Sequence, residues 1–282
     1  MMRLSTLVAD GLTWPEAPRW RDGQLWISDV HAFRLVRIDE RGLVTIVAPV
    51  PGRPSGMGFM PDGRLLLATA VARDLQWVNP DGTLSLACDL KAMTQSYLND
   101  MVVDARGRAW VGDTGFVFGS GEPERPGALL VFDEADGARV AASDIRFPNG
   151  IAITPDGATL YLAETFGNCI TAFEIGDHGM LRDRRRHADL ESSPDGLCLD
   201  AGGHLWVPLL TKGEFHRVSP LGHVVERIPF PGHRAIACTL GGTDRRTLYL
   251  CVSRIDNTDP KNPVRHGAVH ACRVEVAGAG LP

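Results

Sequence analysis

The sequence lacks the features that mark a membrane protein or a nucleic-acid-binding protein. No window approaches the roughly 18 consecutive apolar residues of a membrane span, and the N-terminus has no apolar core of signal-peptide length. The net charge is −5 and no basic stripe runs along the chain, so neither nucleic acid nor a membrane is expected as a partner. The one basic cluster, residues 182–186, follows a turn-like segment and is predicted to be a solvated loop.

Cysteine pairs with the Cys-x-x-Cys spacing are also missing. Several of the six cysteines fall inside apolar, strand-like runs. Without an export signal, this pattern predicts reduced, buried thiols in a cytoplasmic protein. The cysteines are Cys88, Cys169, Cys198, Cys238, Cys251 and Cys272.

Helical periodicity is nearly absent, and a repeated pattern of short strands takes its place. Short apolar runs alternate with turns that contain Gly, Asp or Pro, which is typical of all-β proteins. One unit, a turn usually ending in glycine and then a strand rich in Leu, Trp and Val, recurs six times, and successive copies begin 40 to 50 residues apart. The copies are RDGQLWISD, PDGRLLLAT, ARGRAWVGD, PDGATLYLAE, AGGHLWVPL and TDRRTLYLCV.

A second, more polar hairpin follows each copy, for example LQWVNPDGTLSLACD after the second one. Four short strands per repeat match one blade of a β-propeller. The sequence therefore predicts an all-β fold, a six-bladed β-propeller that forms a single domain over residues 1–282. The last repeat is one strand short, so an N-terminal strand around Leu4 to Ala9 is expected to pair with residues 268–276 and close the last blade.

Polar residues occupy equivalent positions ahead of the repeated turns. Four of the six members of this series carry a carboxylate or a carboxamide. Any one of them alone would more often be a turn residue that bonds its own backbone. Because equivalent innermost-strand positions surround the channel of a propeller, the four together predict a cluster of oxygen atoms that needs a cation. The series is Glu16, Ser55, Asn99, Asn149, Asp195 and Ala235.

One divalent metal ion is the cofactor that such a cluster predicts. Oxygen donors without a thiolate or imidazole favour Ca²⁺ first, then Mg²⁺ or Mn²⁺. Zn²⁺ is a further candidate, although it does not prefer ligation by oxygen alone.

Several segments resemble the senescence marker protein/regucalcin–gluconolactonase family. They include PEAPRW, LNDMVVDARGRAWVGD, PNGIAITPDGATLYLAET and PDGLCLDAGGHLWV, and the resemblance covers essentially the whole chain. It implies a six-bladed propeller with one divalent ion in the central channel, held by Glu16, Asn149 and Asp195. Asn99 matches a residue at the metal site that also meets substrate. Many members of the family hydrolyse sugar lactones, and diisopropyl-fluorophosphatase and paraoxonase-like enzymes share the architecture.

The chain departs from this family beside Asn99. Sugar-lactonase members often carry Arg two residues before the matching Asn, where it contacts polar substrate, whereas this chain has Tyr97. Tyr97 therefore favours a less polar lactone. Glu122 and Glu124 lie in a predicted loop, and a contact with substrate stays open for both.

The predicted function is that of a lactonase-type carboxylic ester hydrolase that opens a lactone to its hydroxy acid. A fixed cation would stabilise the charge that develops on the carbonyl oxygen. Asp195 is the predicted catalytic base for the attacking water, and Glu16 is the anionic anchor of the ion. Asn99, Tyr97 and His31 are the predicted substrate-binding residues.

A nucleophilic serine is a weaker alternative. The sequence contains no Gly-x-Ser-x-Gly elbow. Ser28, Asp29 and His31 could form a catalytic device only if residues so close in sequence reached the required geometry. Asp29, Asp113 and Glu164 end equivalent strands. Each could bond to the backbone of the adjacent turn or support the metal ligands from behind, and both roles stay open.

Two other functions remain open at this stage. The same metal site could hydrolyse phosphotriesters or fluorophosphates, because these reactions also need a polarising ion and an activated water. A Ca²⁺-binding propeller without enzymatic activity is the third alternative, since the fold alone does not fix activity. The expected partner is a small-molecule lactone, and the oligomeric state is not predicted.

Overall fold

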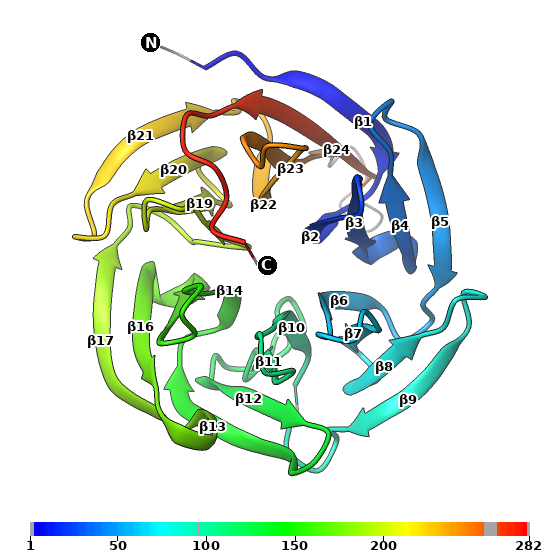
Figure 1. The fold of residues 1–282 in the computed structure, drawn as a ribbon, viewed down its shortest axis with the longest axis vertical. Helices are drawn as coiled ribbons and strands as arrows, with labels where there is room; N and C mark the ends of the chain where they lie inside the picture. The colour runs from blue at the N-terminus through cyan, green and yellow to red at the C-terminus, as the bar shows by residue number, and fades with distance from the viewer. Residues whose placement is uncertain (1–2, 95, 257–263, 281–282) are drawn as a thin grey trace.

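Six four-stranded antiparallel sheets stand as blades around a central axis (Figure 1). The computed structural model describes residues 3–94, 96–256 and 264–280. Five blades use four consecutive strands, and the sixth has the order β22-β23-β24-β1. The structure therefore confirms the predicted all-β, six-bladed β-propeller.

The strands fall into four concentric layers. The innermost strands are β2 (Pro15–Arg21), β6 (Pro54–Phe59), β10 (Leu98–Val103), β14 (Pro148–Ile153), β18 (Cys198–Leu199) and β22 (Arg234–Gly241). The second strands are β3 (Gln24–Asp29), β7 (Leu65–Thr69), β11 (Ala109–Asp113), β15 (Thr159–Glu164), β19 (Leu205–Leu209) and β23 (Thr247–Asp256). The third strands are β4 (Arg34–Ile38), β8 (Asp74–Val78), β12 (Gly127–Asp133), β16 (Cys169–Ile175), β20 (Glu214–Val218) and β24 (Val264–Arg273). The outer strands are β5 (Val44–Pro49), β9 (Leu84–Asp89), β13 (Gly137–Ile145), β17 (Leu181–Asp189), β21 (Val224–Pro229) and β1 (Thr6–Leu12).

Three short 3₁₀ helices complete the described elements: η1 (Val30–Ala32), η2 (Thr165–Gly167) and η3 (Asp177–Gly179). None of the helices in the described part of the chain has the length and apolarity needed to cross a membrane.

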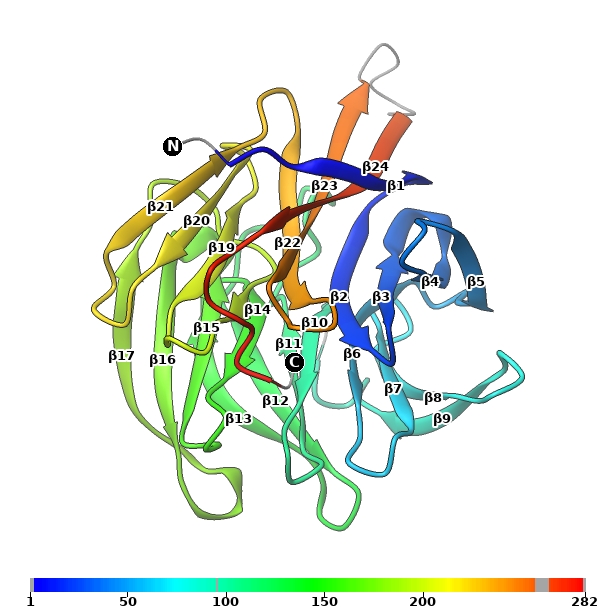
Figure 2. The same ribbon diagram turned by 45° about the horizontal axis from the view of Figure 1, so that its top comes forward.

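The N-terminal strand closes the ring, as the sequence predicts. β1 runs antiparallel to β24, with Thr6 opposite Ala271 and Leu12 opposite Gly267 (Figure 2). Leu12 is only 3% exposed, whereas Leu7 on the same strand is 55% exposed. Strand pairing and the burial of one face of β1 thus join the beginning of the chain to its last blade.

The repeated turns connect each innermost strand to the second strand of its blade. Gly157 in the PDG turn between β14 and β15 has a φ of +70°, which L-residues with a side chain rarely adopt. Glycine adopts this conformation without a steric penalty, so the recurrence of glycine in these turns has a backbone cause.

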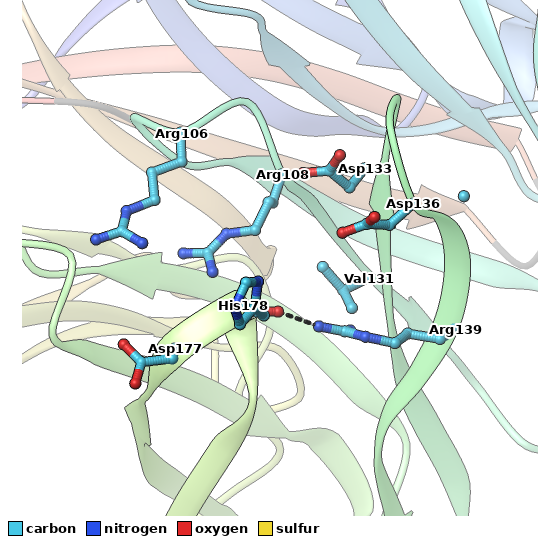
Figure 3. Close-up of a pocket in the computed structure, with 9 residues that line it drawn as sticks. Arg106, Arg108, Val131, Asp133, Asp136, Arg139, Asp177 and His178 are labelled. Carbon is cyan, nitrogen blue, oxygen red and sulfur yellow. Dashed lines mark hydrogen bonds between the residues drawn. The ribbon is translucent and has the colours of Figure 1, made fainter.

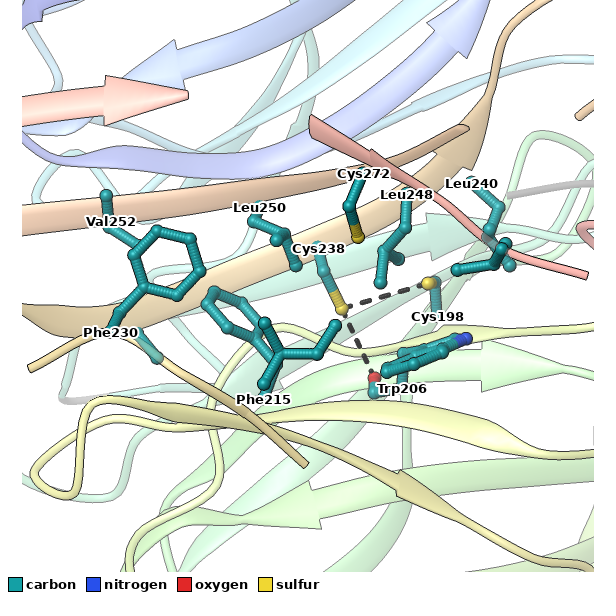
Figure 4. Packing of buried hydrophobic residues seen from close by; sticks show 13 residues of the cluster. Cys198, Trp206, Phe215, Phe230, Cys238, Leu240, Leu248, Leu250, Val252 and Cys272 are labelled. Atoms are coloured by element: carbon teal, nitrogen blue, oxygen red, sulfur yellow. Dashed lines mark hydrogen bonds between the residues drawn. The ribbon is translucent and has the colours of Figure 1, made fainter. Parts of the chain in front are cut away.

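Apolar side chains fill the spaces between blades. Between the fifth and sixth blades, Trp206 and Phe215 pack with Leu250 and several other buried side chains (Figure 4). The Sγ atoms of Cys198 and Cys238 lie 3.8 Å apart inside this cluster. All six cysteines are free thiols, and five are buried as predicted, whereas the sixth, nearer the surface, is half-buried.

The two faces of the ring differ. β23 and β24 are ten residues each and extend as a hairpin beyond the face at which the innermost strands begin (Figure 2). On the opposite face, the C-terminal segment pairs with the turn after β18, where Asp200 and Gly278 form a bridge. The hairpin therefore stands at the end of the central axis where the innermost strands begin.

Candidate metal centre

The six polar-series positions are structurally equivalent. Each directly follows a residue that pairs with the end of the second strand of its blade. These pairs are Pro15 with Asp29, Pro54 with Thr69, Leu98 with Asp113, Pro148 with Glu164, Pro194 with Leu209, and Arg234 with Ser253. The series therefore lies at one end of the central axis, on the face where the β23–β24 hairpin extends.

A break in strand register follows these positions in at least five blades. In the first blade the register shifts between Glu16 and Arg19, and in the fourth between Pro148 and Ile151. β-Bulges of this kind re-aim side chains near functional sites. The bulges explain why polar residues are found on strands whose other side chains are almost entirely buried.

Asn149 presents a buried oxygen atom without a hydrogen-bond partner. Its Nδ2 donates to Thr165 Oγ1 over 3.1 Å, and Thr165 Oγ1 in turn donates to the carbonyl of Pro194 over 2.9 Å. Asn149 is 5% exposed, and its Oδ1 accepts no hydrogen bond from any residue that the structure describes. A buried carbonyl oxygen left in this state costs free energy unless a ligand binds it.

Asp195 carries a second such oxygen. It is 2% exposed, and its buried Oδ1 has no hydrogen-bond partner among residues 3–94, 96–256 and 264–280. Burial, with a further contribution from the negative charge of Asp100, raises the pKa of Asp195 to about 8, although the Asn149 amide opposes the shift. The carboxylate form therefore lacks a compensating cation.

Glu16 lies on the first blade and faces the negative charges of Asp195 and Asp100. Burial and the charges of Asp195 and Asp100 raise its pKa well above the ordinary value. Trp14 Nε1 donates to Glu16 Oε1 over 3.0 Å, which orients the carboxylate.

A buried ion pair between Asp100 and Arg19 lies beside this cluster, and the sequence analysis missed both residues. Arg19 Nη2 lies 3.2 Å from Asp100 Oδ1 and also donates to the carbonyl of Met101, and Arg19 Nε donates to the carbonyl of Met57 over 3.1 Å. Arg19 thus links the innermost strands of three blades. Even so, burial raises the pKa of Asp100.

One sequence signal could have identified Asp100. The residue after the polar-series position is glycine in three blades, Gly56, Gly150 and Gly196. A Cβ at Gly150 would come within 2.4 Å of the backbone nitrogen of Leu197, so adjacent innermost strands require glycine there. Asp100 occupies the corresponding place in the third blade, where its side chain instead reaches Arg19.

Asn99 is half-buried on the same face of the ring. Its Nδ2 donates to the carbonyl of Pro148 over 3.1 Å, which orients the amide between the third and fourth blades. The predicted roles of Asn99, as metal ligand and substrate contact, both require its amide oxygen, which this hydrogen bond leaves available.

Tyr97 directly precedes β10 and His31 lies just after β3, so both lie on the same face of the ring as the polar series. The guanidinium carbon of Arg53 lies 4.9 Å from the centroid of the Tyr97 ring. His31 packs edge-on against Trp14, with ring centroids 6.0 Å apart. Burial and the charges of Arg265 and Arg53 lower the pKa of His31 to about 4, so its imidazole is neutral at neutral pH.

The acids that end the second strands position the segments before the innermost strands. Asp29 Oδ1 accepts hydrogen bonds from the backbone nitrogens of Thr13 at 2.8 Å and Trp14 at 3.2 Å. Glu164 Oε2 accepts one from the backbone nitrogen of Arg146 at 2.9 Å. Both acids therefore hold the backbone segments that lead into β2 and β14, on which Glu16 and Asn149 lie.

The remaining candidates lie outside the cluster. Glu122 accepts a hydrogen bond from the backbone of Val117 and pairs with Arg125 at 2.7 Å, so its own loop holds it, and Glu124 is exposed. Ser28 Oγ is buried and has no hydrogen-bond partner within the described part of the chain, so the side chain is not assembled with Asp29 and His31 as a catalytic device.

The donor set fits a hard divalent cation. Among the described residues, no three His, Cys, Asp or Glu side chains are grouped as metal ligands. The oxygen donors that the series offers here are the carboxylates of Glu16 and Asp195 and the amide oxygen of Asn149. The two buried oxygens without hydrogen-bond partners and the raised carboxylate pKa values are features that a bound cation would compensate.

A surface crevice lies on another part of the ring. It has a volume of about 390 Å³ and is lined by Arg106, Arg108, Arg139 and His178, among others (Figure 3). Arg108 pairs with Asp104 at 2.7 Å in the turn after β10, which places the crevice at the opposite face from the polar series. Arg108 is paired with Asp104, and Arg139 donates to the carbonyl of His178, so the candidate centre remains the cluster formed by the polar series.

Comparisons with known proteins agree with this architecture. A family model described as the SMP-30/Gluconolactonase/LRE-like region matches residues 14–254, which include Glu16, Asn99, Asn149 and Asp195. A 6-deoxy-6-sulfogluconolactonase from Pseudomonas putida is 29% identical over 279 residues, which cover 95% of this chain and 93% of the relative.

Two solved structures share the fold. A gluconolactonase from Xanthomonas campestris has a TM-score of 0.80 at 25% identity, covering 97% of this chain and 90% of that one. A calcium-binding protein, regucalcin, from Agrobacterium tumefaciens has a TM-score of 0.85 at 21% identity, covering 100% and 97%. The second similarity shows the fold alone.

Proposed function

Because the chain belongs to the SMP-30/gluconolactonase/LRE-like family, we propose that it is a metal-dependent lactonase that hydrolyses a cyclic ester to the hydroxy acid. The observation that carries the proposal is the pair of buried, unpartnered oxygens, Asn149 Oδ1 and Asp195 Oδ1, next to the Glu16 carboxylate. The names of two similar proteins, a sulfogluconolactonase and a gluconolactonase, support the choice of a lactone as substrate.

Glu16, Asn149 and Asp195 would hold one divalent ion, with Asn99 as a ligand directly or through water. Ca²⁺ is the ion that this all-oxygen set favours, ahead of Mg²⁺, Mn²⁺ and Zn²⁺. When bound, such an ion supplies polarisation of an ester carbonyl and lowers the pKa of a coordinated water.

Asp195 and the residues that orient the ligands have separate roles in the proposed reaction. Asp195 accepts the proton from the attacking water while the water oxygen bonds to the carbonyl carbon of the lactone. The bond between that carbon and the ring oxygen then breaks, and the same proton passes to the ring oxygen to give the hydroxyl of the product. Thr165 holds the Asn149 amide, and Trp14 holds Glu16, so both ligands are oriented before substrate binds.

Tyr97, Asn99 and His31 are the proposed substrate contacts at the channel mouth. Neutral His31 can donate one hydrogen bond and accept another, which suits hydroxyl groups on a lactone ring. Asn99 has its amide oriented by the carbonyl of Pro148.

A lactone screen with metal-stripped and reconstituted protein tests the proposal. We expect hydrolysis of at least one aldonolactone to be lost after chelation and restored by Ca²⁺ or another divalent ion. A phosphotriester and a fluorophosphate belong in the same screen. Turnover of these compounds without lactone hydrolysis would favour the alternative hydrolase, and binding of Ca²⁺ without any turnover would favour a non-enzymatic propeller.

A further inference from the structure

Arg53 is a cationic residue at the channel mouth that the proposed metal centre does not use. It lies on the segment that leads into β6, two residues before Ser55 of the polar series. Arg53 is half-buried, and its Nε atom is buried without a hydrogen-bond partner in the described part of the chain. Burying a guanidinium nitrogen in this way is costly unless an anion or a carbonyl completes its hydrogen bonds.

The Tyr97 ring fixes the orientation of this guanidinium. The Arg53 guanidinium carbon stands 4.9 Å from the ring centroid, within the range of a cation–π contact. A planar guanidinium held over an aromatic face still presents its N–H edges, and that fork matches the oxygens of a carboxylate, sulfonate or phosphate.

The surrounding charge also favours an anion. Arg265 lies opposite Ile255 on the β23–β24 hairpin that rises at this face. The charges of Arg53 and Arg265 both act on His31, which places the three groups at the same mouth. Glu16 is the acidic residue whose charge acts on Arg53, and a bound divalent ion would neutralise Glu16.

We infer that Arg53, held against Tyr97, binds an anionic substituent of the lactone substrate: a carboxylate, sulfonate or phosphate group remote from the reacting ester. The inference rests on the proposed lactonase function and names the class of substrate. It also changes the expectation of a less polar lactone that follows from Tyr97 alone. Position 97 carries Tyr where sugar-lactonase members often carry Arg, and Arg53 on the neighbouring blade supplies a guanidinium instead.

Kinetics with a matched pair of lactones tests this subsite. One is a neutral aldonolactone, and the other is the same ring with a sulfonate on its exocyclic carbon. Arg53→Met should lower kcat/KM for the sulfonated lactone about 10- to 100-fold, as expected for loss of a charge-assisted contact, and change the neutral lactone less than about 3-fold. Arg53→Lys should recover part of the loss, because the charge remains but the planar fork does not.

Arg21 provides the matched control. Its guanidinium carbon also lies over an aromatic ring, 4.6 Å from the centroid of Phe59, but at the far end of β2 on the opposite face. Arg21→Met should leave the ratio of the two kcat/KM values unchanged. An equal loss on both lactones in Arg53→Met, or an equal shift of the ratio in Arg21→Met, would overturn the assignment.

A binding measurement separates this inference from the lactonase proposal. Calorimetry would compare a methyl glycoside bearing a 6-sulfonate with its neutral counterpart on Ca²⁺-loaded protein. Binding of the sulfonate that Arg53→Met weakens at least about 10-fold would support the subsite even if no lactone is hydrolysed. Lactone hydrolysis with no preference for the anion and no such binding would remove the subsite and leave the lactonase proposal standing.

Discussion

The Nδ2 atom of Asn149 donates a hydrogen bond to Thr165 Oγ1 over 3.1 Å and thereby holds the Asn149 carbonyl oxygen, buried and unpartnered, on the other arm of the amide. The same hydroxyl donates to the carbonyl of Pro194, directly before Asp195. Thr165 therefore holds the side chain of Asn149 and the backbone directly before Asp195, so one threonine supports two proposed ligands from neighbouring blades.

Thr165→Val should weaken binding of the divalent ion about 10- to 100-fold, because partners that orient ligands typically contribute that much to affinity. Calorimetric titration of chelator-treated protein with Ca²⁺ measures the effect. Thr165→Ser keeps the hydroxyl and serves as the control, with an expected affinity close to that of the wild type. Equal affinities in the Val variant and the wild type would show that Asn149 does not need this support.

Asp195→Asn should abolish most lactone hydrolysis even when the protein is saturated with metal. Asn keeps the shape and one ligand oxygen but cannot take a proton from water, and loss of a general base typically costs about 10²- to 10⁴-fold in rate. Elemental analysis of the wild type should give one divalent ion per chain, and the metal content of the variant must be measured beside its turnover. A fully metallated Asp195→Asn protein with near-normal turnover would remove Asp195 from the mechanism.

The metal-free protein should lose stability as the pH rises from about 4 towards 8. The pKa of Asp195 is raised from 3.8 to about 8 in the folded protein, so in this window the unfolded chain is ionised while the folded protein retains the proton. The free energy of unfolding then falls by at most about 1.4 kcal/mol per pH unit for this group, and Glu16 acts in the same direction.

Bound metal should reverse this trend, because the ligands must be ionised to bind the cation. The increase in Tm on addition of Ca²⁺ should therefore grow with pH up to about 8. Thermal melts between pH 5 and pH 8, with chelator or with excess Ca²⁺, measure both effects, and Asp195→Asn should flatten the pH dependence of the chelated protein. A Ca²⁺-induced shift in Tm that is constant across this range would contradict the proposed ligand set.

Leu12→Ala should destabilise the whole ring by about 2–5 kcal/mol, because Leu12 is buried on the strand that closes the last blade. Leu7→Ala on the same strand is the matched control and should cost less than about 0.5 kcal/mol, since Leu7 is 55% exposed. Denaturant unfolding measures both values. Deletion of the first ten residues should lower the Tm further, and an unchanged Tm in that truncation would show that β1 does not stabilise the ring.

The sequence by itself determined the repeat and everything that follows from the repeat. Turn residues such as Gly157 and the apolar runs around them are local signals, and their recurrence predicts the number of blades. The equivalence of Glu16, Asn99, Asn149 and Asp195 is also a property of the repeat, because residues in the same register of successive blades meet around one axis. The closing strand could be predicted because the last repeat is visibly one strand short.

Only the tertiary structure decided which side chains from different blades meet. Asp100 and Arg19 are 81 positions apart, and Arg53 reaches Tyr97 from the preceding blade. Neither pair leaves a periodic trace, because each is made by side chains that break the pattern of their own repeat. Arg19 is paired with Asp100, whereas the buried Nε of Arg53 has no hydrogen-bond partner among the residues that the structure describes. This difference depends on the distances between blades, and those are set only when the ring closes and its core packs.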